Sequence, residues 1–524
     1  MIPMNTKLSF SVVLLTALLT LSASVSAQGF DPATVDWEKI GKIPMKDMFI
    51  KKFNKNCAGC HGEDLRGATL GPPLVGDELR YGDSVEELVN SIANGTPGTE
   101  MPAWKETMKE QDIYNLALYI AEKRQGTTIL DKNDGIELAI PEGVIETQKA
   151  SFVIETVATG IDALPFSIAP LPEGGFLLSE RKYGLSFIDA EGNKTAIENT
   201  PTVYADTGMF LGQVQGLGWM LEVALHPDYE DNGWVYLHYT DRCSGCNELS
   251  KRGNNLPVSM NRVVRGRIED NRWIDEELIW EADKEHYTNT SDLAAAGRLT
   301  FDDEGYVYFS VGMKDTLDVM GIQDLSKPYG KLHRMNDDGR LPEDNPFVDT
   351  DGAIPSIYAL GLRSVQGLAF NEETGELWTT EMGPRGGDEL NRIKKGGNYG
   401  WPIFTNGINY DGRPIKLPKD MKVELTEEEA IFPVVDWTPA VAISNLRFYD
   451  SDEFPEWQGN IIAGTLRATD LLRLEVEDGE VVHTEVLIEN LARFRDVKLG
   501  PDGELYLLLE HKTDSQIIRL KAAD

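Results

Sequence analysis

The stretch NKNCAGCHGEDL contains a Cys-X-X-Cys-His run, formed by Cys57, Cys60 and His61. This spacing puts two thiols and an imidazole on one helical turn, where the thiols can form thioethers with haem c and the imidazole can bind its iron. Further along, the Gly/Pro-rich segment NGTPGTEMPAW carries Met101, whose sulfur is a candidate second ligand for the iron. Met108 is the alternative ligand, but it lies within an amphipathic segment and is expected to pack in the core.

The segment QDIYNLALYIAEKR predicts a helix, because its apolar residues recur at helical spacing: Ile113, Leu116, Ala117 and Ile120. With the haem motif it resembles a small class I cytochrome c over residues 47–124. The resemblance implies a small all-α domain with His61 and Met101 on opposite faces of the iron. A thioether ligand favours the ferrous state, so we expect this domain to accept electrons.

Residues 1–27 have the layout of a cleaved secretory signal, with Lys7, an apolar run and small residues ending in Ala27. An uncleaved anchor is the alternative, although the apolar run is short for a membrane span. No later segment is apolar for long enough to cross a bilayer, so we expect an exported protein, periplasmic or secreted, without an integral membrane segment. The formal net charge of −36 argues against nucleic acid or an anionic membrane as a partner.

Residues 125–149 are polar, with scattered Gly and Pro, and are predicted to link a cytochrome domain at 28–124 to a second domain at 150–524. In the second domain an apolar strand, a turn with Gly and another strand recur. The instances are IAPLPEGGFLLSE, VALHPDYEDNGWVYLHY, RLTFDDEGYVYFSVG, GLAFNEETGELWTTEMG, LRFYDSDEFPEWQGNIIAG and VKLGPDGELYLLL. Six such units predict an all-β six-bladed propeller around a central channel; a pair of β-sandwiches is the alternative.

Arginines lie close to several of these repeats. Arg493 and Arg495 are two residues apart on an expected strand and therefore face the same way. Arg363 lies in YALGLRSVQGLAF, and Arg467 lies in AGTLRATDLLRL. A single arginine of this kind usually makes only a surface salt bridge, but four at a channel mouth would bind a ligand with several negative charges.

The stretches GLRSVQGLAF, EMGPRGGDELNRIKKGGNYGWP, TLRATDLLRL and RFRDVKLGPDGELY resemble the soluble glucose and aldose sugar dehydrogenases that depend on pyrroloquinoline quinone (PQQ). The resemblance covers most of residues 151–520 and is most specific in the second half. It implies a six-bladed propeller that carries PQQ and Ca²⁺ in its channel. Arg493 and Arg495 would hold the quinone, and Arg467, which replaces the family's lysine, would pair with one of its carboxylates.

The same resemblance implies further contacts. Gly383 and Pro384 would offer backbone carbonyls to Ca²⁺, which would polarise the quinone carbonyl that accepts hydride. Gln215, with Gln213 close by, corresponds to a glutamine that contacts the cofactor. His226, in a His-Pro-Asp turn, would be structural.

The largest departure from the family concerns the catalytic base. The family has a histidine three residues before the Gly of a Gly-Arg-Leu segment, where this chain has Ala294. Arg363, which we count with the catalytic residues, is followed by Ser364 where the family usually has asparagine. Asp292 or His286 could replace the base, or the base is lost and the propeller binds without oxidising.

Together these residues predict a quinohaemoprotein dehydrogenase that oxidises a neutral sugar or alcohol at PQQ and passes electrons to its own haem c. An external cytochrome or copper protein would then accept the electrons. The alternative is a non-catalytic carbohydrate-binding propeller joined to an electron-carrier cytochrome. Cys243 and Cys246, in DRCSGCNEL, lack a following histidine and are predicted to form a local disulfide in an oxidising compartment.

Overall fold

The computed structural model describes residues 47–127, 138–206, 208–210, 213–252, 255–314, 319–417 and 425–523. The predicted signal sequence at 1–27 lies outside these ranges, as do residues 128–137 of the predicted linker. No helix within them is long and apolar enough to cross a membrane.

The N-terminal part of the chain is a small helical domain. Its helices are α3 (Asp47–Asn56), α4 (Ala58–His61), α5 (Val85–Asn94) and α6 (Glu110–Arg124). A capping box between Ser84 and Glu87 begins α5. The predicted apolar stripe of α6 faces the core, where Leu116 is fully buried and the ring of Tyr119 lies 5.7 Å from that of Phe53 on α3.

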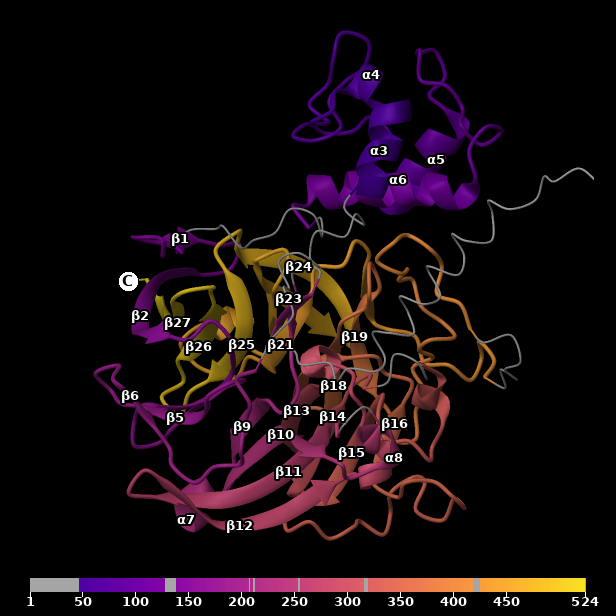
Figure 1. Ribbon diagram of the computed structural model, residues 1–524. Helices are drawn as coiled ribbons and strands as arrows, with labels where there is room; N and C mark the ends of the chain where they lie inside the picture. The colour runs from indigo at the N-terminus through magenta and orange to yellow at the C-terminus, as the bar shows by residue number, and fades with distance from the viewer. Residues whose placement is uncertain are drawn as a thin grey trace, which may run out of the picture.

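The rest of the chain forms six antiparallel sheets, which are the blades of a propeller (Figure 1). From the innermost strand outward, the first three blades are β3 (Pro165–Pro170), β4 (Phe176–Glu180), β5 (Gly184–Ile188) and β6 (Lys194–Ala196); β9 (Met220–Leu225), β10 (Val235–Ser244), β11 (Pro257–Glu269) and β12 (Arg272–Glu281); and β13 (Ala296–Phe301), β14 (Tyr306–Val311), β15 (Lys331–Asn336) and β16 (Ile357–Leu360).

The next two blades are β17 (Val365–Asn371), β18 (Glu376–Glu381), β19 (Asp388–Ile393) and β20 (Val435–Trp437); and β21 (Ile443–Phe448), β22 (Ile461–Thr465), β23 (Leu471–Glu477) and β24 (Glu480–Ile488). The last blade joins the two ends of the propeller: β25 (Arg493–Leu499), β26 (Leu505–Glu510), β27 (Ser515–Ala522), β2 (Ser151–Ile161) and β1 (Ile145–Glu146).

Short elements complete the connections: β7 (Gly208–Phe210), β8 (Gln213–Gln215), α7 (Tyr229–Asn232), α8 (Glu248–Lys251), η4 (Lys284–His286), η5 (Asp292–Ala294), η6 (Val319–Gln323) and η7 (Pro455–Trp457).

The ring is closed by pairing between strands from opposite ends of the propeller sequence. β2 runs antiparallel to β27, with Phe152 opposite Ala522, and the innermost strands of neighbouring blades contact one another around the ring. The last blade is thus built from both ends of the propeller sequence, which locks the ring closed. The predicted six-bladed propeller is therefore confirmed, and the alternative of two β-sandwiches is wrong.

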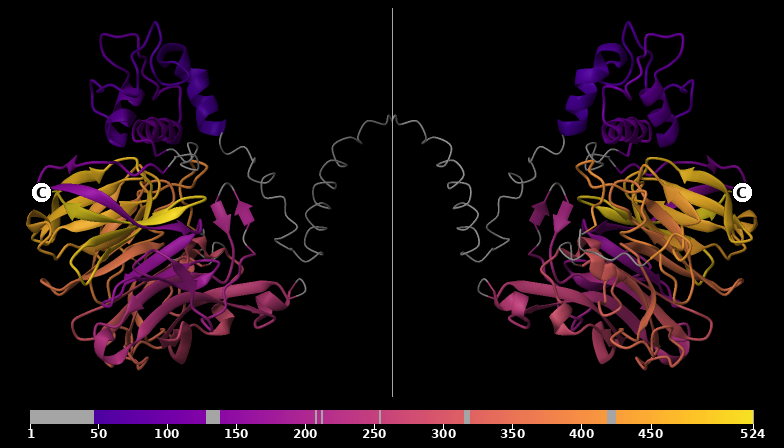
Figure 2. Two further views of the ribbon diagram at one scale, coloured as in Figure 1. Left: turned by 90° about the vertical axis from the view of Figure 1, so that its left-hand side faces the viewer. Right: turned by 90° about the vertical axis from the view of Figure 1, so that its right-hand side faces the viewer.

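The helical domain docks on one end of the propeller, which we call the helical-domain end. The innermost strand of each blade begins at this end. The loop that connects the second strand of each blade to the third also lies here. Arg385 there donates to both carboxylate oxygens of Glu122 on α6, at 2.7 Å each, and both side chains are buried. The ring of Phe49 lies 3.9 Å from the Arg385 guanidinium, and Ile408 packs into the helical core. In Figures 1 and 2, α6 lies next to the propeller and α4 lies at the far end of the helical domain.

Candidate haem and quinone sites

The haem motif has the arrangement that a covalent haem requires. Cys57 and Cys60 are free, half-buried thiols; Cys57 is the N-cap of the single turn α4, and Cys60 lies within it. His61 is buried, and its Nδ1 lies 2.8 Å from the carbonyl oxygen of Pro72. A proton on Nδ1 donated to this carbonyl leaves the Nε2 lone pair for iron. Met101 packs against the helical core, as Met108 does.

Arg493 and Arg495 meet at the start of β25, as their spacing predicts. Both share one buried carboxylate: Arg493 Nε donates to Glu510 Oε1 at 2.8 Å, and Arg495 Nη2 donates to Glu510 Oε2 at 2.5 Å. The two guanidinium charges hold the pKa of Glu510 well below its usual range despite burial. One carboxylate thus faces two arginines, and the pair keeps a positive charge.

Arg467 joins this group from the neighbouring blade, in the turn between β22 and β23. Arg493 Nη1 donates to the carbonyl of Leu466 at 2.8 Å, which places the two loops in contact. The charge of Arg467 also attracts the carboxylate of Asp388 on the next blade.

Arg363 lies over the loop that carries Gly383. Its Nη1 donates to the carbonyls of Met382 and Gly383, at 2.7 Å and 3.0 Å, and its backbone N–H donates to Glu381. The Nε of Arg363 is buried without a hydrogen-bond partner. Ser364 is buried beside it and accepts from Gln366 at 3.1 Å.

Two buried carboxyl groups, Asp388 and Glu381, bind the backbone of Gly383 and Arg363, and the half-buried Glu389 lies near Glu381. Asp388 accepts from the backbone N–H of Gly383 at 2.9 Å, and burial raises its pKa to about 6. Burial also raises the pKa of Glu389 to about 7, and burial followed by the Glu389 charge raises that of Glu381. In all three groups burial thus favours the protonated, neutral form.

Deeper in the channel, charges are balanced. Arg298 on β13 donates to Glu222 at 2.7 Å and Asp496 at 3.2 Å, while Lys498 pairs with Glu222 at 2.5 Å. The network joins the inner strands β9, β13 and β25 across the channel. Two cations face two anions, so the excess positive charge lies above it, at the helical-domain end.

Asp292 is buried and fully engaged. Its Oδ1 contacts Lys314 Nζ and accepts from Ser259 at 2.7 Å. Its Oδ2 accepts from the Gly218 N–H at 2.6 Å and from Thr240 at 2.5 Å. The Asp292 segment is close to Arg363, because Met313, next to Lys314, donates its N–H to the Arg363 carbonyl at 2.7 Å.

His286 lies apart from the arginines in the contacts described for it. It ends η4, is half-buried, and has Glu285 as its nearest ionised partner at 3.6 Å. Burial, followed by the charge of Lys327, lowers its pKa. Ala294, at the family's base position, ends η5 and is half-buried.

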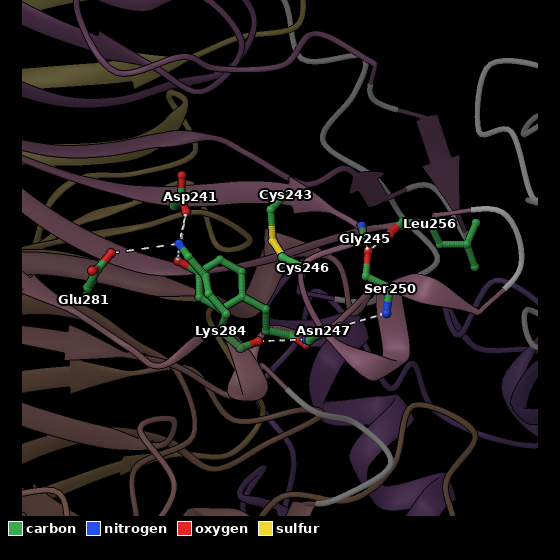
Figure 3. The surroundings of a disulfide bond; sticks show 10 residues. Asp241, Cys243, Gly245, Cys246, Asn247, Ser250, Leu256, Glu281 and Lys284 are labelled. Carbon is green, nitrogen blue, oxygen red and sulfur yellow. Dashed lines mark hydrogen bonds and ion pairs between the residues drawn. A yellow bond between two sulfur atoms is a disulfide. The ribbon is translucent and has the colours of Figure 1, made fainter.

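The predicted disulfide between Cys243 and Cys246 is present (Figure 3). Beside it, Asn247 donates to the carbonyls of Lys284 and Tyr287, at 2.8 Å and 2.9 Å, and so fixes the segment that carries His286. Gln215 ends β8, but its side chain and that of Gln213 lie outside the description.

Comparison with known proteins assigns the propeller to a protein family. A family profile described as glucose/sorbosone dehydrogenase matches residues 162–519. The chain belongs to this family. Aldose sugar dehydrogenase YliI of Escherichia coli (strain K12) is 34% identical over 352 residues, which are 67% of this chain and 88% of that protein.

Two solved structures of similar proteins have the same propeller. The apo-form of the soluble aldose sugar dehydrogenase from Escherichia coli has a TM-score of 0.60 at 31% identity, covering 71% of this chain and 100% of its own. The PQQ-bound aldose sugar dehydrogenase from Streptomyces coelicolor has a TM-score of 0.53 at 25% identity, covering 71% and 99%.

A second profile, described as cytochrome c oxidase, cbb3-type, subunit III, matches residues 51–120. The helical domain is therefore a cytochrome c domain. This glucose/sorbosone dehydrogenase family member thus joins a cytochrome to the propeller end that carries the arginines.

The residues at this end fit an anionic quinone and a hard cation. Arginines with partnerless buried N–H groups are suited to carboxylates. The Gly383 carbonyl accepts from Arg363 but has a second lone pair to offer a cation. No group of three His, Cys, Asp or Glu side chains suited to a metal was found among the described residues, so Ca²⁺ here would depend on carbonyl oxygens.

Three residues of the site have no signal in the sequence. Glu510 and Lys314 are single charged residues near strand ends, and only the fold brings them to Arg495 and Asp292. Arg181, in LSERKYG, is buried at the same end of the propeller next to Arg495. A buried arginine cannot be told from an exposed one by its neighbours in the chain.

Proposed function

We propose that this protein oxidises a neutral sugar, or another alcohol, at PQQ held with Ca²⁺ in the propeller, and that electrons then pass to haem c in the same chain. An external cytochrome or copper protein would take the electrons from the haem. The expected setting is the periplasm or the exterior of the cell.

One observation supports the proposal: the loop proposed to hold Ca²⁺ also contacts the cytochrome domain. Gly383 and Pro384 carry the carbonyls proposed for Ca²⁺, and the next residue, Arg385, binds Glu122 of the cytochrome domain. The proposed quinone site and the electron acceptor therefore share one end of the propeller and one connection.

The arginines would bind and orient the quinone. Arg493 and Arg495 have a fixed geometry because Glu510 holds them from below, and Arg467 approaches from the next blade. When bound, PQQ would supply a two-electron acceptor for a hydride from the carbon that bears the hydroxyl group, and haem c would supply a one-electron acceptor. Arg363 would fix the carbonyls of Met382 and Gly383 toward the cation.

The hydroxyl proton of the substrate also needs an acceptor. Asp292 is the first candidate, because its segment contacts the backbone of Arg363 through Met313. One of its four hydrogen-bond donors would have to move away before it accepted a proton. His286 is the second candidate, and it would have to approach the arginines from η4.

The alternative, a carbohydrate-binding propeller without chemistry, is favoured by Ala294 and by the full engagement of Asp292. It gives no reason for two arginines at the channel mouth, Arg493 and Arg495, that share the single carboxylate of Glu510. The two functions differ in whether a sugar reduces the haem.

The test uses the haem-loaded protein with PQQ and Ca²⁺, and follows haem absorption while aldoses and simple alcohols are offered. Reduction that requires both the sugar and PQQ supports the proposal. A haem that stays oxidised with bound PQQ, across the whole panel, supports the binding protein instead. Omission of PQQ is the control for direct reduction of haem by the sugar.

A further inference from the structure

Arg181 is a buried arginine at the helical-domain end of the propeller. It follows β4 and is 6% exposed. Its backbone N–H donates to the Leu164 carbonyl and its own carbonyl accepts from the Met220 N–H, each at 3.1 Å. These bonds connect the beginnings of two neighbouring blades, so the side chain leaves a fixed backbone position.

The guanidinium of Arg181 lies close to two buried aromatic rings. Its central carbon is 5.4 Å from the ring centroid of Phe166 and 5.4 Å from that of Trp219. The rings attract a cation but do not neutralise its charge.

No carboxylate pairs with Arg181 among the residues that the structure describes. The preceding Glu180 binds Lys194 instead, at 2.9 Å, and both oxygens of Glu510 are taken by Arg493 and Arg495. The Nε–H of Arg181 is buried without a hydrogen-bond partner. An unpaired buried ion is costly, so a fold keeps one where a partner of opposite charge arrives later.

The surroundings add positive charge rather than remove it. Burial, followed by the charge of Arg495, lowers the pKa of Arg181 to about 9, so the group still carries its charge at neutral pH. Arg181, Arg493 and Arg495 thus face the single carboxylate of Glu510.

We propose that Arg181 is a further cofactor-binding residue, which donates hydrogen bonds to a carboxylate of the quinone together with Arg493 and Arg495. The inference rests on the proposed function in naming PQQ, a tricarboxylate, as the ligand. The aromatic pair of Phe166 and Trp219 fixes the guanidinium, and the bound carboxylate supplies the missing negative charge.

The test compares Arg181→Met with Arg340→Met, which removes the same charge from an exposed arginine. PQQ affinity is measured with Ca²⁺ present by equilibrium dialysis, and unfolding of the PQQ-free protein is measured in denaturant. For Arg181→Met we expect affinity to fall about ten- to a hundredfold, the loss for one charged hydrogen-bond partner. Its PQQ-free form should be at least as resistant to denaturant as the parent, because a buried unpaired charge is gone.

The trimethyl ester of PQQ separates charge recognition from shape. It should bind the parent and Arg181→Met equally, because no carboxylate is left to recognise. The inference is overturned if Arg181→Met binds PQQ as tightly as the parent does, whether or not the variant unfolds at a lower denaturant concentration. Arg181→Lys should lie between the two, because an ammonium keeps the charge without the planar fork.

Failure of the proposed function gives a different result. If the parent binds no PQQ, the proposed function fails, and sulfate and citrate become the probes of the arginines. Citrate that raises the unfolding midpoint of the parent and of Arg340→Met, but not of Arg181→Met, would keep Arg181 as an anion-binding residue. If citrate raises the unfolding midpoints of all three proteins equally, Arg181 is not an anion-binding residue either.

Discussion

Arg385 of the propeller and Glu122 of the cytochrome domain form a buried two-point ion pair across 263 residues of sequence. The pair lies one residue from Pro384, at the edge of the proposed Ca²⁺ site. Figure 1 shows α6 between the propeller and α4, so the haem motif lies on the outer side of the domain. The contact through α6 fixes the domain to the propeller, and the haem motif lies on the side that faces away from it.

Glu122→Gln tests this contact. It leaves Arg385 buried and without a charged partner, which costs about 3–5 kcal/mol and should release the domain. We expect sugar-dependent reduction of haem to slow severalfold in stopped-flow absorption, while reduction of a small artificial acceptor stays unchanged. Glu106→Gln, an exposed change of the same charge, is the control. Faster haem reduction in Glu122→Gln would show that the docked arrangement restrains transfer.

Asp292→Asn tests whether the buried Asp292–Lys314 pair is structural or catalytic. The change should lower the free energy of unfolding by about 3 kcal/mol or more, because Lys314 loses its counterion. Adding Lys314→Met should restore part of this loss in denaturant unfolding, while Glu248→Gln in an exposed pair should change little.

The double variant then separates the two roles. If it folds, binds PQQ and still oxidises sugar at the parent's rate, Asp292 is not the base. If it folds and binds PQQ but turnover is lost, Asp292 is retained as the proton acceptor, and His286→Ala should leave turnover unchanged.

The propeller was predictable because each blade repeats a local signal. The six repeated segments are the first and second strands of the six blades, and turns such as PEGG and PDGE mark them in the sequence. The closure of β2 on β27 had no such signal, because it depends on pairing between residues far apart in the chain. Local alternation specifies a hairpin, whereas ring closure depends on all six blades together.

The site was predictable only where its residues share a local motif or a family resemblance. Arg493 and Arg495 share a strand face, and the spacing of Cys57, Cys60 and His61 is itself the signal. The contacts of Asp292 were not foreseen, because its four donors come from four other segments. Arg385 stands in a stretch that carries the family resemblance, yet nothing there indicates a cytochrome domain as its partner.

Met101→Ala tests the second iron ligand in the haem-loaded protein. Loss of a thioether should remove the low-spin ferrous spectrum and lower the reduction potential, because sulfur stabilises the reduced iron. Met108→Ala is the matched control, since both side chains pack against the same core. A spectrum that changes in Met108→Ala and not in Met101→Ala would reverse the assignment.

The pH dependence of the free energy of unfolding should reflect the protonation of the buried His333. Its Nε2 donates to the carbonyl oxygen of Pro328 at 2.8 Å, its Nδ1 lies 2.9 Å from the hydroxyl of Ser356, and burial lowers its pKa to about 3. The unfolded histidine binds a proton near pH 6.5, so its contribution is fully present above that pH and is lost as pH falls toward 3. The maximum slope from this group is about 1.4 kcal/mol per pH unit.

Other groups titrate in the same window with the opposite sign. Asp388 has a raised pKa, so the folded protein favours its protonated form, and its contribution to the free energy of unfolding increases as pH falls. The measurement is therefore a difference: the free energy of unfolding of the parent and of His333→Gln, each from pH 7 to pH 4. We expect the free energy of unfolding to fall less between pH 7 and pH 4 in His333→Gln than in the parent. In His483→Gln, which changes an exposed histidine, we expect the same fall as in the parent. Equal slopes in all three proteins would mean that His333 is protonated in the folded state as readily as in the unfolded chain.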